Sequence, residues 1–111
     1  MKIEFGLKEN DIFKINKIFQ KYHEIKEVII YGSRALGNYR PGSDIDLTLI
    51  GNGLNLNLIN KLATDIDDLL LPYLFDISIY QHIKNEDLLL HIDRNGKVFY
   101  HSQTATAIKK E

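Results

Sequence analysis

The chain alternates segments of helical hydrophobic spacing with short apolar runs typical of strands. Between Asn10, a good N-cap residue, and Glu24, the spacing predicts an amphipathic helix. Its apolar positions are Ile12, Ile15, Phe19 and Tyr22. Residues 28–31 and 47–50 are apolar and β-branched and are each followed by glycine, so both are predicted strands.

A second helix is predicted from about Leu54 to Leu71, followed by Pro72, which restricts the conformation of the residue before it. The apolar positions of this helix are Leu58, Leu62, Ile66, Leu69 and Leu70. Their spacing places one apolar face toward a core.

The last third of the chain repeats the same alternation. Residues 75–80 are predicted to form a third strand, Asn85 to cap a short helix that ends at residues 95–96, and residues 97–100 to form a last strand. Alternating helices and strands in a short chain predict an α/β (α+β) fold, a sheet covered by helices. Whether the sheet is parallel or mixed does not follow from the periodicity.

Composition limits the chain to one ordinary domain. The 111 residues are 44% hydrophobic and 26% charged, with a formal net charge of -1, so we expect a single domain over residues 1–103 and a polar, frayed tail over 104–111. The basic residues are scattered, which disfavours direct nucleic-acid binding. No apolar stretch is long enough for a membrane span, and the absence of cysteine favours a cytoplasmic location.

Candidate chemistry is concentrated between the first two predicted strands. A strand that ends in Gly32-Ser33, followed by residues able to begin a helix, presents backbone N–H groups and a hydroxyl to an anion such as phosphate. Gly32 lacks a Cβ, so phosphate oxygens are expected to approach its main chain closely, and Ser33 can donate a hydrogen bond to them. This turn is therefore a predicted nucleotide-binding element.

Three aspartates are the candidate catalytic residues and metal ligands. Asp44 and Asp46 lie two positions apart at the start of a strand, which places both carboxylates on one face, with Ile45 toward the core. Asp76 lies just inside the next strand. Such repelling carboxylates favour a divalent cation, and ligands that are all oxygens favour Mg²⁺, here as a two-metal site.

Two further residues of this segment are secondary nucleotide-binding candidates. Arg34 either contacts phosphate or a partner or is a solvated surface charge, and the sequence does not choose between these. For Ser43 we prefer a role in shaping the turn through its hydroxyl. The four histidines have no paired short spacing, so we interpret them as surface or interface residues rather than zinc ligands.

The spacing of Gly32-Ser33, ten residues, then Asp44-Ile45-Asp46 resembles the signature of the DNA polymerase β-like nucleotidyltransferase superfamily. The fuller strings Gly-Ser-Arg-Ala-Leu-Gly and Arg-Pro-Gly-Ser-Asp-Ile-Asp-Leu resemble its minimal nucleotidyltransferase (MNT) branch. The resemblance implies a nucleotidyltransferase fold with a small mixed sheet, a nucleoside triphosphate donor, two Mg²⁺ ions and a third acidic residue where Asp76 falls. Leu36 departs from it, since the family often has a second basic residue there.

The resemblance also implies a partner. MNT proteins are commonly the antitoxin of a toxin–antitoxin pair with a helical HEPN-domain protein, and some transfer AMP from ATP to a tyrosine of that partner. The expected activity is therefore Mg²⁺-dependent adenylyl transfer to a protein hydroxyl. Two alternatives stay open: an antitoxin that neutralises its partner by occlusion alone, and a small-molecule nucleotidyltransferase. The chain has no acceptor-binding domain of the kind found in larger relatives, which disfavours the second.

Overall fold

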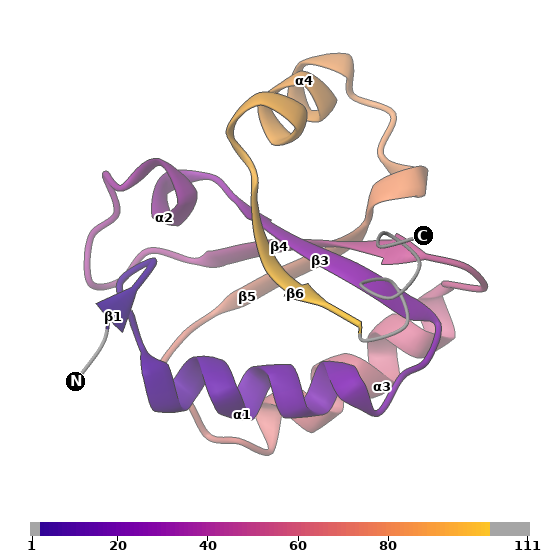
Figure 1. Cartoon of the computed structure of the whole chain (residues 1–111), viewed down its shortest axis with the longest axis horizontal. Helices are drawn as coiled ribbons and strands as arrows, with labels where there is room; N and C mark the ends of the chain where they lie inside the picture. Colours follow the sequence, from indigo (N-terminus) through magenta and orange to yellow (C-terminus); the bar gives the residue numbers. More distant parts are fainter. Residues whose placement is uncertain (1–2, 103–111) are drawn as a thin grey trace.

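A twisted four-stranded sheet organises residues 3–102, the part of the chain that the computed structural model describes (Figure 1). Its strands are β3 (Ile25–Tyr31), β4 (Ile45–Gly51), β5 (Phe75–Ile79) and β6 (Lys97–His101). They lie in the order β5-β4-β3-β6. β3 is antiparallel to both β4 and β6, and β4 is parallel to β5. The sheet is therefore mixed, as the resemblance implied.

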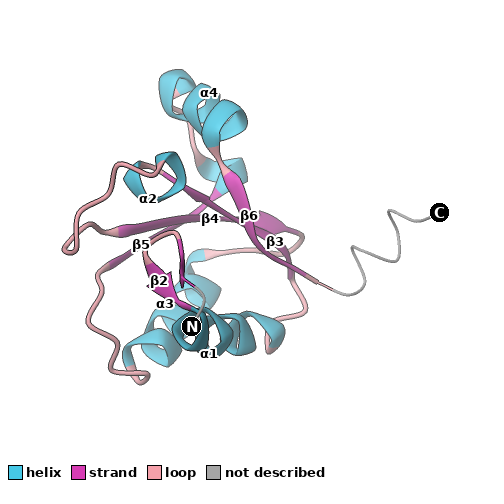
Figure 2. Ribbon diagram, turned by 60° about the vertical axis from the view of Figure 1, so that its left-hand side comes forward, coloured by secondary structure: helices cyan, strands magenta, loops and turns pink. Residues whose placement is uncertain are grey.

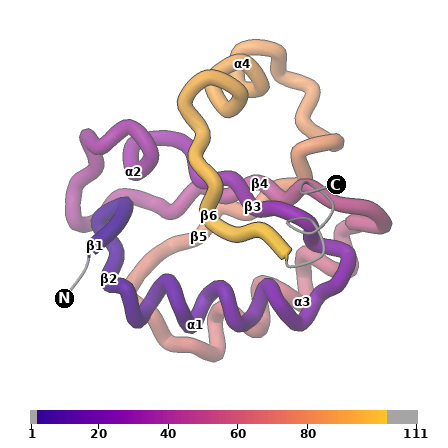
Figure 3. Tube along the Cα trace, in the orientation of Figure 1, coloured from indigo at the N-terminus to yellow at the C-terminus, as the bar shows by residue number. Residues whose placement is uncertain are grey.

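The helices lie on both faces of this sheet, as Figure 2 shows. They are α1 (Glu9–Gln20), α2 (Ser33–Leu36), α3 (Leu56–Asp67) and α4 (Glu86–Asn95). The tube in Figure 3 places α1 and α3 side by side under one face, and α2 and α4 above the other. A small hairpin of β1 (Ile3–Glu4) and β2 (Leu7–Lys8) precedes α1, and a 3-10 turn, η1 (Tyr80–His82), follows β5.

The hydrophobic core fills the space between the sheet and the pair α1 and α3. Strand alternation sends Ile45, Leu47 and Leu49 of β4 into this core, where each is fully buried. The helices supply the facing residues: Ile15, Ile18 and Phe19 from α1, and Leu58, Leu62 and Ile66 from α3. The residues of β4 between them, Asp46 and Thr48, therefore point to the face that carries α2 and α4.

Helix ends follow the side-chain caps where these exist. Asn85 caps α4 as predicted, accepting a hydrogen bond from Leu88 N at 3.0 Å, and Asn55 caps α3 in the same way through Leu58 N at 2.9 Å. The prediction of Asn10 as a cap is wrong, because α1 already begins at Glu9 and Lys8 gives no side-chain cap.

The prediction that the second helix extends to Leu71 is also wrong. α3 ends at Asp67, and Leu70, with a φ of 56° and 88% exposure, belongs to the turn that follows. Leu70 therefore continues the helical spacing of apolar residues in the sequence but lies outside both the helix and the core. No helix among residues 3–102 is long and apolar enough to cross a membrane. The polar tail predicted for residues 104–111 lies outside the described residues.

The end of β4 packs tightly against the chain that enters β3. A Cβ built on Gly51 would lie 1.9 Å from the carbonyl oxygen of Glu24, whereas one on Gly42 has no neighbour within 4 Å. Gly51 is thus required by a lack of space, since the obstructing atom is backbone.

We expect Gly51→Ala to lower the free energy of unfolding by about 1–3 kcal/mol, because the added methyl must push two backbone segments apart. Gly42→Ala is the matched control and should stay within about 0.5 kcal/mol of the unchanged chain. Urea unfolding followed by circular dichroism measures both. Equal stability of the two variants would contradict the packing described for Gly51.

Candidate functional site

Gly32 joins β3 to α2 in a conformation that only glycine adopts readily, with a φ of 77° and a ψ of -157°. A Cβ at this position would lie 2.4 Å from Oδ2 of Asp46. The space left by the missing side chain is therefore filled by a carboxylate. This differs from the sequence interpretation, in which that space admitted phosphate, and it gives the glycine a different physical reason.

Ser33 follows at the start of α2, a single turn of four residues. So short a helix adds little macrodipole to an anion site. Among residues 3–102, however, the Ser33 hydroxyl has no hydrogen-bond partner, although the side chain is partly buried. The hydroxyl is thus free to donate to a ligand, and it is the feature of this turn best suited to phosphate.

Arg34 is 2% exposed, so the alternative of a solvated surface charge is wrong. Its Nε and Nη2 donate to the carbonyl oxygen of Ser43 at 3.1 and 2.8 Å, and its Nη1 donates to the carbonyl oxygen of Phe5 at 2.9 Å. The guanidinium also lies 5.5 Å from the ring centres of Tyr39 and Tyr73. Arg34 therefore ties α2 to the N-terminal hairpin and to the loop before β4.

Ser43 shapes the turn that leads into β4, as preferred from the sequence. Its hydroxyl accepts a hydrogen bond from Arg40 N at 2.8 Å, and its own N–H donates to Arg40 O at 2.9 Å. Its carbonyl oxygen accepts from the guanidinium of Arg34. This turn sets the position of the next residue, Asp44.

The three aspartates meet at one end of the parallel pair β4 and β5. Asp46 lies beside Asp76 in register, while Asp44, exposed, directly precedes β4. Burial raises the pKa of Asp46, the negative charges of Asp76 and Asp44 raise it further, and His91 partly opposes them. Parallel pairing thus brings together carboxylates that are 30 positions apart in the sequence.

The donor set fits a hard cation, because all three candidate ligands are carboxylate oxygens. In the described part of the chain, no group of three or more His, Cys, Asp or Glu side chains is already arranged to hold a metal ion. Mg²⁺ commonly binds through one or two carboxylates together with substrate phosphates, so such a preformed cage is not required. These residues are consistent with Mg²⁺ that arrives with a nucleotide.

A layer of hydroxyl groups that the sequence analysis missed lies beside the carboxylates. Tyr31, 8% exposed, pairs with Asp46 across β3 and β4. Burial raises the pKa of Tyr31, as do Asp76 and Asp46, against the lowering effect of its hydrogen bond with Ser78. Ser78 Oγ lies 3.0 Å from Thr48 Oγ1, within hydrogen-bond distance. Strand alternation could have indicated this shared face, but only strand order places the three hydroxyls together.

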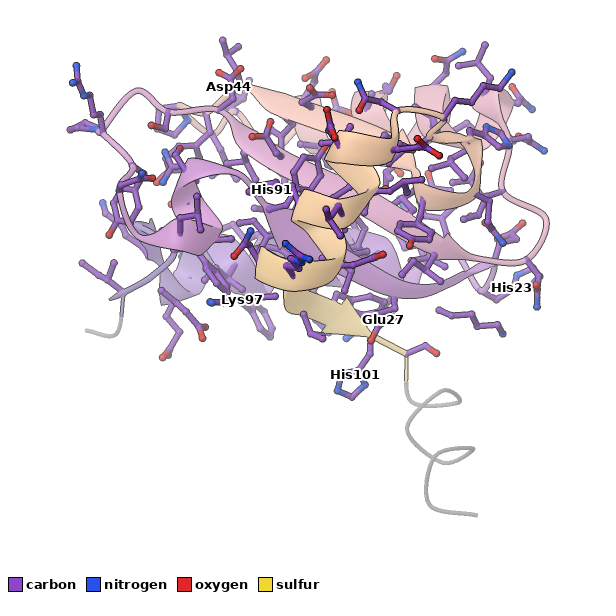
Figure 4. The ribbon with its side chains drawn as sticks, turned by 90° about the horizontal axis from the view of Figure 1, so that it is seen from above. His23, Glu27, Asp44, His91, Lys97 and His101 are labelled. Carbon is purple, nitrogen blue, oxygen red and sulfur yellow. The ribbon has the colours of Figure 1, made fainter. Side chains whose placement is uncertain are left out.

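His91 of α4 also reaches this site. The N–H of Gly32 donates to its Nε2 at 3.2 Å, and its ring packs edge-on against Tyr31 with 6.3 Å between ring centres. Seen from above in Figure 4, His91 lies between α4 and the sheet, while His23 lies at the opposite end of the sheet. His91 is partly exposed, and its contact with Gly32 is one that no local sequence signal would have found.

A cavity of about 620 Å³ opens beside the aspartates, between α3 and the start of β5. Asp44 and Asp76 lie on its wall, and apolar side chains form much of the remainder: Ile59, Ala63, Ile66, Tyr73, Leu74, Phe75 and Ile77. A concave surface with carboxylates at one side is a suitable place for a ligand.

The fold is that of a nucleotidyltransferase domain. Residues 13–105 match the family model described as polymerase beta, nucleotidyltransferase, so the chain belongs to this family. Among curated proteins, none matches the chain.

Solved structures of toxin–antitoxin complexes have the same fold. One, a toxin–antitoxin with AMP-PNP, superimposes with a TM-score of 0.66 at 20% identity, over 92% of this chain and 80% of that one. Another, a tri-AMPylated HEPN toxin of Shewanella oneidensis in complex with its MNT antitoxin, gives a TM-score of 0.62 at 17% identity, over 90% and 77% of the chains. A third, the MntA–HepT toxin–antitoxin, gives 0.62 at 16% identity, over 91% and 79%.

The raised pKa of Asp46 makes stability depend on pH in a defined direction. Folding disfavours the charged carboxylate, so the penalty is present at neutral pH and disappears as the pH falls through the raised pKa toward the ordinary value of 3.8. We expect Asp46→Asn to raise the Tm at pH 7 by about 2–4 °C, equivalent to roughly 0.5 kcal/mol.

The gain should shrink as the pH falls through the raised pKa of Asp46 and vanish below pH 3.8, where the carboxyl is neutral in both the folded and the unfolded chain. Thermal scans of both proteins without added metal, from pH 3.5 to 8, measure it. Asp68→Asn, at an exposed position after α3, is the control. A gain that does not vary with pH would contradict the electrostatic account of Asp46.

Proposed function

We propose that this chain is a Mg²⁺-dependent nucleotidyltransferase that transfers AMP from ATP to a hydroxyl of a protein partner. The observation that carries the proposal is the register of Asp46 and Asp76 across β4 and β5, with Asp44 one residue before β4. Membership of the nucleotidyltransferase family supports it. A purely structural role would leave like charges gathered at one strand end without compensation.

Each residue of the site has a defined part in the proposed reaction. Asp44 and Asp46 would hold Mg²⁺ with the triphosphate, and Asp76 would complete the ligand set. The cation supplies charge stabilisation at the phosphate oxygens. The free hydroxyl of Ser33 donates to a phosphate oxygen, and the Arg34 brace keeps the loop before Asp44 in place.

The transfer is a substitution at the α-phosphorus. The oxygen of the acceptor hydroxyl forms a bond to the α-phosphorus, the bond to pyrophosphate breaks, and the hydroxyl proton passes to the carboxylate of Asp76. A tyrosine or serine hydroxyl is a poor nucleophile at neutral pH, so a nearby carboxylate that accepts the proton lowers the barrier. Asp76 is exposed on an edge strand, where an acceptor on another protein can reach it.

We propose a helical HEPN-type toxin as the partner and one of its tyrosines as the acceptor, which would make the chain an antitoxin. The solved complexes support this, since one contains AMP-PNP and another a tri-AMPylated HEPN toxin with an MNT antitoxin. The present chain matches 80% of the length of the first of these two chains and 77% of the second.

We expect Asp44→Asn and Asp46→Asn to abolish AMP transfer, because a neutral amide removes charge at the same volume and weakens binding of Mg²⁺ with ATP. The assay mixes the purified chain, Mg²⁺, ATP and a purified HEPN-type partner, and follows the partner's mass. Asp68→Asn should transfer at the normal rate. Full transfer by the Asp44/Asp46 double variant would contradict the site.

The same variants separate catalysis from occlusion. If the chain neutralises its partner by covering it, the double variant will still suppress toxicity in cells while forming the same complex. If transfer is the mechanism, suppression will be lost although the complex persists.

Asp76→Asn should separate binding from chemistry. We expect its affinity for Mg²⁺ with ATP to remain within about threefold of the unchanged chain, while the single-turnover transfer rate falls about 100-fold or more, because proton acceptance matters chiefly in the transition state. Calorimetry with a non-hydrolysable ATP analogue gives the affinity, and quenched mixing with the partner gives the rate. Equal rates would make Asp76 a structural strand residue.

A further inference from the structure

His91 is joined to the nucleotide-binding turn across 59 positions of sequence. Its Nε2 accepts the N–H of Gly32 at 3.2 Å, and its Nδ1 lies 3.2 Å from Nδ2 of Asn95, an atom that exchanges with Oδ1 when the amide is turned over. The ring is half-buried and packs against Tyr31, the residue before Gly32. Figure 4 shows His91 beside α4.

The contact with Gly32 fixes the tautomer of the ring. A backbone N–H can only donate, so Nε2 must carry a lone pair, and the proton of the neutral imidazole must be on Nδ1. Nδ1–H then requires an acceptor, which Asn95 supplies when its amide is turned to present Oδ1. With its amide so turned, Asn95, one helical turn after His91, accepts from the form of the ring that can accept from Gly32.

This hydrogen bond holds the N–H of Gly32, whereas the carbonyl oxygen of Gly32 accepts from Leu36 N at 3.1 Å. Gly32 has no side chain, and its φ of 77° and ψ of -157° lie where glycine is conformationally free. α4 itself is loosely packed, with Ile92 as its one buried side chain. The N–H of Gly32 is already engaged by His91, so it is not the donor that a phosphate would use.

We propose that His91, in its Nδ1-protonated form, is a positioning residue that holds the Gly32 turn and thereby the Ser33 hydroxyl in place for nucleotide phosphate. His91 acts through Gly32 and does not touch the substrate. The proposal rests on the proposed function for its consequence in nucleotide binding, but the tautomer and the hydrogen bond are properties of the chain without ligand.

The ligand-free test is nitrogen-15 NMR of the unchanged chain at pH 8. Long-range proton–nitrogen correlations should give His91 a protonated Nδ1 and an unprotonated Nε2, and amide exchange at Gly32 should be slow. His91→Phe keeps an aromatic ring against Tyr31 but has no acceptor, so exchange at Gly32 should accelerate about tenfold or more. His91→Gln retains an acceptor oxygen and should restore most of the protection.

The functional test is the affinity for Mg²⁺ with ATP by calorimetry. We expect His91→Phe to weaken it about tenfold and His91→Gln to stay within about threefold, since one hydrogen bond is at stake. His23→Phe replaces an imidazole that is 93% exposed at the far end of the sheet and should change neither quantity.

The outcomes distinguish the two proposals. A proton on Nε2, or equal Gly32 exchange in the unchanged chain and His91→Phe, would overturn the role of His91. If the unchanged chain does not bind Mg²⁺ with ATP, the proposed function fails, while the NMR result still decides the contact. If His91→Phe does not fold, the tautomer of the unchanged chain and Gly32 exchange in His91→Gln still decide it.

Discussion

The site depends on the close approach of one carboxylate to one glycine. Oδ2 of Asp46 occupies the space where a side chain at Gly32 would begin. Because β3 and β4 pair in register, with Tyr31 opposite Asp46, the end of β3 must pass directly beside that carboxylate. Any larger residue at Gly32 would displace either the strand pairing or the charge. The Gly32-Ser33 turn and the carboxylates are thus parts of one packed arrangement.

The two faces of the sheet differ: one packs against the hydrophobic core, and the other carries the carboxylate of Asp46. Alternate residues of β4 are fully buried against α1 and α3, and the residues between them face α2 and α4. The core face is apolar, and its burial stabilises the short chain. This stabilisation offsets the repulsion among the carboxylates on the other face. The parallel pairing of β4 with β5 adds Asp76 at the same end, since both strands begin there.

Two polar side chains, the buried Arg34 and the half-buried His91, hydrogen-bond to backbone groups around the site. Arg34 directs its donors to carbonyl oxygens of Phe5 and Ser43, which links the N-terminal hairpin, α2 and the loop before Asp44. His91 accepts from Gly32 and links α4 to the same turn. Irregular segments take a defined geometry when charged or imidazole side chains form hydrogen bonds with their backbone groups. The Gly32 turn and the loop before Asp44 are therefore positioned by side chains rather than by regular secondary structure.

The sequence alone determined the local features, because these depend on neighbouring residues. Hydrophobic spacing predicted the main helices and strands, Asn85 was correctly predicted as a cap, and the alternation around Asp46 placed Ile45 and Leu47 in the core. Tertiary structure alone decided the parallel register of Asp46 with Asp76, the burial of Arg34, the contact of His91 with Gly32, and the end of α3 before Leu70. The first three of these join segments distant in sequence, and periodicity carries no information about which distant segments meet.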